Sequence, residues 1–251
     1  MNLVRFRSRI QQFLSAGNEF LFPAVCHICD RELHTSDRSD FCHECLSELL
    51  NFESNRCEIC SAVIGPNLRS ETGCYYCQDD KFKFERVTTL GTYENLLKEA
   101  ILRGKVGHDV VILQSLTKLL LESFSERILS VKANLILPIP HHWRDRLLQS
   151  SQASNTISNY LGQLLNVPSA QQILRKVERT AKQHSLTPAE RRQNLKSAFK
   201  TSKKTNLSGA RILLVDDVIT TGTTCQRAAR ELHHAGAESV QVFALARGIG
   251  A

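Results

Sequence analysis

The stretch RILLVDDVITTGTTC, residues 211–225, places two carboxylates and a threonine-rich segment between a strand and a helix. Its apolar run Leu213–Val215 predicts a buried strand of a parallel sheet, because short apolar runs bounded by turn residues are typical of such strands. Asp216 and Asp217 follow at the carboxyl end of that strand. Residues 220–224 predict a tight turn, and the segment CQRAARELHHAG predicts a helix that ends at its glycine.

This order of elements predicts a site for a ribose 5-phosphate unit. Ligands of open α/β sheets bind beyond the carboxyl ends of the strands. The N-terminus of a helix binds phosphate, and threonine hydroxyls add donors around it. Two carboxylates just upstream accept hydrogen bonds from a pair of vicinal sugar hydroxyls, or hold a hydrated Mg²⁺.

Two other interpretations of the acidic strand fit less well. A Walker B strand needs a partner motif G-x-x-x-x-G-K-[ST], which the chain lacks. An acidic pair of a receiver-like domain does not account for a Thr-Thr-Gly-Thr-Thr loop. The phosphate-loop interpretation is therefore favoured.

Charge and cysteine content divide the chain into two parts. Residues 1–80 hold 7 arginines and 12 acidic residues, a net charge of −5, whereas residues 81–251 carry +12. Eight of the nine cysteines lie between residues 26 and 77. We expect an N-terminal amphipathic helix over 1–22, a double zinc ribbon over 23–80, and a larger basic domain over 81–251.

The N-terminal segment does not have the features of a membrane or export signal. No apolar run approaches the roughly 20 residues that span a bilayer. Residues 1–22 lack a continuous apolar stretch and a small-residue cleavage site. We therefore expect a cytoplasmic protein.

The cysteines form four C-x₂-C pairs separated by 12, 11 and 13 residues. Two thiolates three residues apart face one metal from a tight turn, and two such turns complete a tetrahedral site. The pattern predicts two structural zinc ions. The candidate ligands are Cys26, Cys29, Cys42, Cys45, Cys57, Cys60, Cys74 and Cys77.

Disulfides, a crossed pairing and histidine ligands are the alternatives to this metal assignment. Four disulfides would suit an exported domain, but the remainder of the chain is poor in cysteine and no signal peptide is expected. We expect the first pair to join the second and the third to join the fourth, although a crossed arrangement stays open. His27, His34 and His43 are expected at the surface, since eight cysteines already complete two sites.

The basic part alternates strands with helices. Strands are expected over 86–94, 134–140, 211–217 and 239–247. Helices are expected over 95–105, ending near Gly104, over about 108–129 and over 155–165. Such alternation predicts a mostly parallel sheet with helices on both faces.

Two basic segments are candidates for ligand contact. PIPHHWRDR follows the strand 134–140, and the guanidinium groups of Arg144 and Arg146 match phosphate oxygens. Residues 175–204 hold ten Lys or Arg and two Glu. This second segment predicts either a flap that closes over a diphosphate or a basic strip that follows a nucleic-acid backbone. A solvated basic surface is the simplest alternative.

Together these segments resemble the ComF/GntX family of phosphoribosyltransferase-like proteins. The resemblance covers nearly the whole chain and rests on five stretches. These are LFPAVCHIC, ILPIPHHWRDRL, RTAKQHSLTPAERRQNLKSAF, LLVDDVITTGTT and HAGAESVQVFALAR. One departure concerns the second stretch: family members usually continue with Arg-Gly-Phe-Asn-Gln, whereas this chain reads LLQSSQ and keeps only Gln152.

The resemblance implies a type I phosphoribosyltransferase fold that binds 5-phosphoribosyl 1-diphosphate (PRPP) with Mg²⁺. Asp216 and Asp217 would be the catalytic residues and hold the ribose hydroxyls. The 5-phosphate would lie on Thr220, Thr221, Gly222, Thr223 and Thr224. The diphosphate and flexible loops would contribute His141, Arg144, Arg146, Arg175, Lys176, Arg179, Gln183 and Arg191.

Two kinds of function follow from these observations. The resemblance implies a PRPP-binding protein that acts in uptake or handling of single-stranded DNA, with single-stranded DNA and a competence helicase-like protein as partners. The alternative is an active phosphoribosyltransferase that moves ribose 5-phosphate from PRPP to an unidentified base in nucleotide salvage. No segment of the sequence indicates a base-recognition hood.

Overall fold

The computed structural model describes residues 23–33, 40–50, 55–64, 73–78, 82–140, 152–176, 199–202 and 205–248. The chain divides into two compact units, Met1–Leu50 and Asn51–Ala251, and each is described by itself. The expected helix over 1–22 lies outside the described residues.

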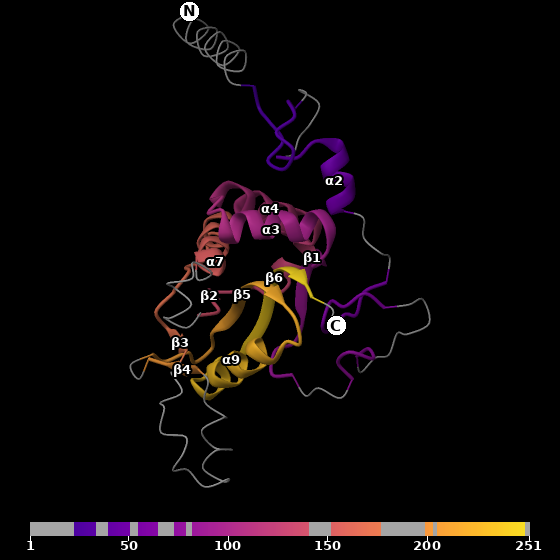
Figure 1. Ribbon diagram of the computed structural model, residues 1–251. Coiled ribbons are helices and arrows are strands. Elements are labelled where there is room, and N and C mark those ends of the chain that lie inside the picture. Colours follow the sequence, from indigo (N-terminus) through magenta and orange to yellow (C-terminus); the bar gives the residue numbers. More distant parts are fainter. Residues whose placement is uncertain are drawn as a thin grey trace, which may run out of the picture. The chain divides into compact units, whose positions relative to one another are not determined.

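A four-stranded parallel sheet forms the centre of the larger unit (Figure 1). Its strand order is β1 (Val87–Thr92), β6 (Ser239–Arg247), β5 (Arg211–Ile219) and β2 (Leu135–Pro138). All three pairings are parallel. The two central strands are almost entirely buried, because helices cover both faces of a sheet of this type.

The helices lie on the two faces of this sheet. Between β1 and β2 come α3 (Asn95–Val106), α4 (Val110–Ser123) and α5 (Ser125–Leu129), and α7 (Gln152–Leu165) follows β2. The helix α9 (Thr223–His234) joins β5 to β6, and Figure 1 shows it on the opposite face from α4 and α7.

Alternate residues of β5 pack on opposite faces of the sheet. Ile212 and Leu214 belong to the apolar core that α9 completes through Ala228 and Leu232. The intervening residues face the other side, because successive side chains of a strand alternate. The same alternation continues into the two aspartates at the end of the strand.

The expected parallel sheet is confirmed, with differences in detail. The strand that begins at Arg211 continues to Ile219, so both aspartates lie within it. The long helix expected over 108–129 is divided at Phe124, whose φ of −129° and ψ of 32° are not helical. A short antiparallel pair, β3 (Leu174–Lys176) and β4 (Phe199–Thr201), was not expected.

A glycine that was expected to end a helix instead lies inside it. Gly104 is buried within α3, and a Cβ at this position would lie 2.5 Å from Cγ of Leu113 in α4. The residue therefore permits close packing of α3 on α4, and the helix continues to Val106.

The smaller unit contains one regular helix among its described residues, α2 (His43–Leu49). It begins directly after Cys42 and carries Cys45 on its buried face. Within the described parts of the whole chain, no helix is long and apolar enough to cross a membrane.

Candidate functional site

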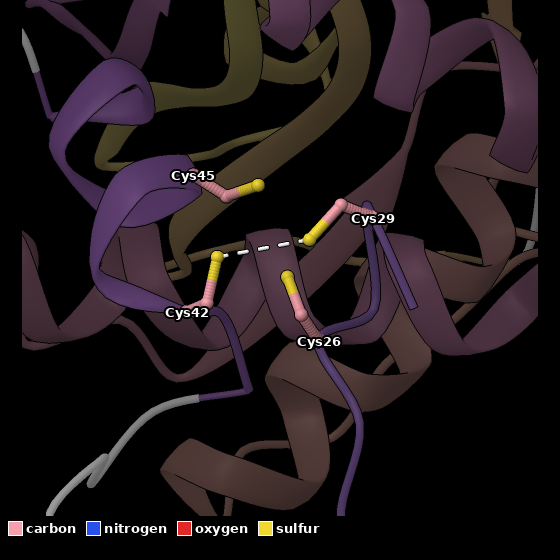
Figure 2. A group of neighbouring side chains, drawn as sticks. All are labelled: Cys26, Cys29, Cys42 and Cys45. Carbon is pink, nitrogen blue, oxygen red and sulfur yellow. Dashed lines mark hydrogen bonds between the residues drawn. The ribbon is translucent and has the colours of Figure 1, made fainter. Parts of the chain in front are cut away.

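The eight paired cysteines gather into two separate clusters of four. The first holds Cys26, Cys29, Cys42 and Cys45 (Figure 2), and the second holds Cys57, Cys60, Cys74 and Cys77. Within each cluster all sulfur atoms lie within 4.8 Å of one another. The sequential pairing expected from the sequence is confirmed, and the crossed arrangement is excluded.

The spacing of the sulfur atoms fits a tetrahedral zinc ion. Tetrahedral ligands at the usual Zn–S distance lie about 3.8 Å from each other. The Sγ atoms of Cys29 and Cys42 are 3.7 Å apart, and those of Cys60 and Cys74 are 3.6 Å apart. The described residues therefore form two sites for structural Zn²⁺, which supplies folding energy when it is bound.

The first turn of each cluster has the same backbone design. The amide of Cys26 donates to the carbonyl of Arg31 over 2.8 Å, and the amide of Cys57 donates to that of Ala62 over 2.9 Å. The residue after each second cysteine has a positive φ, 57° at Asp30 and 60° at Ser61. The two ribbons are thus structural repeats.

The thiols of the second cluster show why it needs a cation. A hydrogen bond from the Cys60 thiol, together with backbone donors, lowers the pKa of Cys57 to about 4. The same hydrogen bond and burial raise the pKa of Cys60 far above its usual value. Four buried thiols cannot all ionise next to one another without a positive charge. A zinc ion provides that charge and deprotonates coordinating thiols.

Histidine does not take part in either cluster among the described residues. His43 is exposed, and His27 is partly exposed with its ring edge toward Phe41 at 6.4 Å between centroids. His34 lies outside the described residues.

The second ribbon is bonded into the larger unit. The amide of Val87 in β1 donates to the carbonyl of Ile59 over 2.8 Å, and the hydroxyls of Ser61 and Thr89 lie 2.8 Å apart. Arg127 of α5 donates to the side chain and the carbonyl of Glu58. The expected boundaries at 22/23 and 80/81 stay predictions, but this ribbon and the sheet share one compact unit.

The two aspartates at the end of β5 point to opposite faces of the sheet. Asp216 lies on the α9 side, within electrostatic range of the buried Cys225 of α9. On the other side, Asp217 forms an ion pair with Lys105 of α3, with 2.7 Å between Nζ and Oδ2. Only 7% of Asp216 and 2% of Asp217 are exposed.

The surroundings of Asp216 disfavour its charged form, whereas Asp217 has a direct cationic partner. Burial and the neighbouring Asp217 raise the pKa of Asp216 to about 8, although the backbone and two lysines oppose the shift. Those lysines are Lys105 and Lys176. Asp217 has its own cation, and its attraction raises the pKa of Lys105 despite burial. Asp216 therefore holds its proton far more tightly than an exposed carboxyl group does.

The threonine-rich segment leads from β5 into the first turn of α9. Gly222, with φ of 76°, precedes the helix, and the hydroxyls of Thr221 and Thr223 lie 2.9 Å apart. This places hydroxyl groups beside the unpaired amides that every helix N-terminus carries. The arrangement suits a phosphate dianion.

Residues outside this loop hold it in place. Arg247 at the end of β6 is buried and donates to the carbonyl of Thr220. Phe82 and Phe84 are stacked at 4.4 Å between centroids, and a Cβ on Gly222 would lie 3.4 Å from Cε1 of Phe82. Phe82 also packs against the second cysteine cluster.

The remaining candidate residues are only partly described. Arg175 and Lys176 form part of β3, and Lys176 acts electrostatically on Asp216. The candidates that lie outside the described residues are His141, Arg144, Arg146, Arg179, Gln183 and Arg191.

Three residues of the site were not anticipated from the sequence: Lys105, Arg247 and Phe82. Lys105 and Arg247 lie at the ends of a helix and a strand that were expected. No local pattern marks them, because basic residues are common at such positions.

Matches to known families agree with this geometry. Residues 155–250 match the family model of the phosphoribosyl transferase domain, and residues 18–79 match that of the double zinc ribbon domain. The chain is therefore a protein with a phosphoribosyltransferase fold and an N-terminal double zinc ribbon.

Relatives with both parts identify the family. The chain is 29% identical to Competence protein F of Haemophilus influenzae over 231 residues, which cover 90% of this chain and 98% of that protein. It is 27% identical to DNA utilization protein YhgH of Salmonella typhi, covering 90% and 97%, and 26% identical to Competence protein ComFC of Bacillus subtilis, covering 82% and 83%. The chain belongs to the ComF family.

Proposed function

We propose that this protein binds PRPP together with Mg²⁺ and acts in the uptake or handling of single-stranded DNA in the cytoplasm. The observation that carries the first part is the placement of two buried carboxylates directly before a threonine-rich helix N-terminus. The names of the relatives, competence and DNA utilization proteins, support the second part.

Each part of PRPP has a matching group in the site. The 5-phosphate accepts hydrogen bonds from the threonine hydroxyls and from the first amides of α9. The ribose hydroxyls donate to Asp216 and Asp217, and Lys176 adds a positive charge nearby. Carboxylate oxygens also suit Mg²⁺, which would neutralise the diphosphate when it is bound.

Charge supports contact with DNA. Residues 81–251 carry a net charge of +12, and neutralising phosphates is the main source of non-specific affinity for nucleic acid. Basic residues are concentrated over 175–204, a segment that contains ten Lys or Arg and only two Glu. A helicase-like partner stays a prediction.

Catalysis of a transfer is the second candidate function. An ionised carboxylate beside the ribose would stabilise the positive charge that develops as diphosphate leaves, and the Asp217–Lys105 pair supplies such a carboxylate. The acceptor would be a base nitrogen, with transfer to it breaking the bond from ribose to diphosphate.

Calorimetry with PRPP and Mg²⁺ tests the proposal. We expect saturable binding to the wild-type protein and none to the double variant D216N/D217N, because each amide replaces one acceptor oxygen with a donor and removes the negative charge. Equal affinity in a folded double variant would exclude this site. A diphosphate-release assay with different bases then separates binding from transfer: release with one base would make the protein an enzyme.

Salt dependence tests contact with DNA. Affinity for a single strand should fall with salt at a slope of roughly −0.7 per neutralised phosphate. Replacing Arg175, Lys176, Arg179 and Lys182 with alanine should flatten that slope by about 2 to 3 units. A variant that loses PRPP affinity but keeps its salt slope would assign the segment to PRPP instead.

A further inference from the structure

The ion pair between Lys105 and Asp217 joins two residues that are 112 positions apart in sequence. The Asp217 side chain is 3% exposed and that of Lys105 is 25% exposed. Long lysine side chains are seldom buried unless they are paired. The ion pair with Asp217 therefore accounts for the largely buried position of Lys105 near the end of β5.

Both carboxylate oxygens of Asp217 are fixed by the protein. Oδ1 accepts a hydrogen bond from the amide of Val218 over 2.7 Å, and Oδ2 is paired with the ammonium of Lys105 over 2.7 Å. An ionised carboxylate offers about four acceptor positions. Among the described residues, Oδ2 is buried and its contact with Lys105 lacks hydrogen-bond geometry, so charge attraction fixes this oxygen.

The position of Lys105 follows from the packing of its helix. Its neighbour Gly104 lets α3 lie against Leu113 of α4, which fixes the last turn of α3. Tyr93 and Asp216 are the other titratable groups that interact with the ammonium. Lys105 is thus the cation that balances Asp217 in this group.

We propose that Lys105 is a positioning residue of the ligand site, whose ammonium pairs with Asp217 and orients that carboxylate toward a ribose hydroxyl of PRPP. This inference rests on the proposed function. It assigns to Lys105 the role of orienting Asp217 before PRPP binds. Without Lys105, Asp216 and Asp217 would share a buried site that disfavours charge, and Asp217 would lose its orientation.

A double-mutant cycle on PRPP affinity tests the inference. We expect K105M to lower the affinity for PRPP with Mg²⁺ at least about tenfold, D217N to lower it similarly, and the combination to lower it no further than the weaker-binding single variant. The variant K105R should retain most of the affinity because it restores the positive charge. The control K98M removes an exposed lysine from the same helix and should bind as the wild type does.

The outcomes separate the two proposals. If wild-type protein binds no PRPP, the proposed function fails, and this inference falls with it. If the wild type binds and K105M binds equally well, only the role of Lys105 is overturned. Additive losses in the double variant would also overturn it, because they would show that Lys105 contacts the ligand independently of Asp217.

Protein folding is followed in the same variants. Circular dichroism and thermal unfolding without ligand show whether K105M is folded. If K105M does not fold, the cycle is carried out with K105Q, for which the same non-additivity is expected. If K105R fails to restore affinity in a folded protein, the charge of Lys105 is not its contribution and the inference is wrong.

Discussion

Loss of the second zinc site should destabilise the phosphoribosyltransferase domain itself, whereas loss of the first should not. The variant C60S removes one ligand of the second cluster, and C45S removes one of the first. Both cysteines are buried. The two variants are therefore matched in chemistry and differ in which compact unit contains the cluster.

The magnitude follows from the contacts that the second ribbon makes. Five hydrogen bonds join residues 56–61 to residues 87–89 and to Arg127. At about 0.5–1.5 kcal/mol each, and less where Glu58 is exposed, their loss would cost about 3 kcal/mol. In a unit of roughly 200 residues this corresponds to a fall in Tm of about 6–12 °C.

Differential scanning calorimetry of the full chain measures the effect, with zinc content determined for each variant. We expect C60S to lower the main unfolding transition by this amount and C45S to leave it within about 2 °C of the wild type. Equal shifts in the two variants, each lacking one zinc ion, would refute the reasoning. An unchanged transition in zinc-depleted C60S would do the same.

Three further substitutions test the ligand loop and its carboxylates. G222A should lower the free energy of unfolding by about 1–2 kcal/mol, because a side chain at a φ of 76° is strained, and urea unfolding measures the loss. R247M should weaken PRPP binding, because it removes the donor to the Thr220 carbonyl. The control R211M, at the opposite end of β5, should bind PRPP as the wild type does. An R247M affinity equal to that of the wild type would contradict the role of Arg247 in holding the loop. The raised pKa of Asp216, about 8 against roughly 3.9 when unfolded, means that the folded protein holds a proton that the unfolded chain has released. Wild-type stability should therefore fall relative to D216N as pH rises from about 4 to 8, and parallel curves in urea unfolding would contradict that pKa.

The sequence predicted the parts of this protein that depend on local pattern. The run from Leu213 to Val215 identifies a buried strand by its apolar side chains alone. The C-x₂-C spacing likewise predicts metal sites, because two thiolates three residues apart suit one ion. The pairing of the cysteine turns was left open in part, because it depends on how the chain folds between them.

Features that depend on contacts between distant elements were not predicted. Gly104 appeared to end a helix, but its lack of a side chain is used in packing against Leu113. Lys105 meets Asp217 only because α3 lies near the end of β5. The antiparallel pair of β3 and β4 has strands of three residues, too short for an alternating pattern to be recognised.

The stacked rings of Phe82 and Phe84 have a consequence for how such a protein can be divided or recombined. Phe82 packs against the second cysteine cluster and also lies beside Gly222 of the phosphate loop. A shortened chain that begins at residue 81 would keep the whole phosphate loop, but Phe82 would lose the second cysteine cluster against which it packs. In chimaeras made from two family members, the second ribbon should therefore come from the same parent as the transferase fold. The first ribbon belongs to a separate compact unit, so it should tolerate replacement.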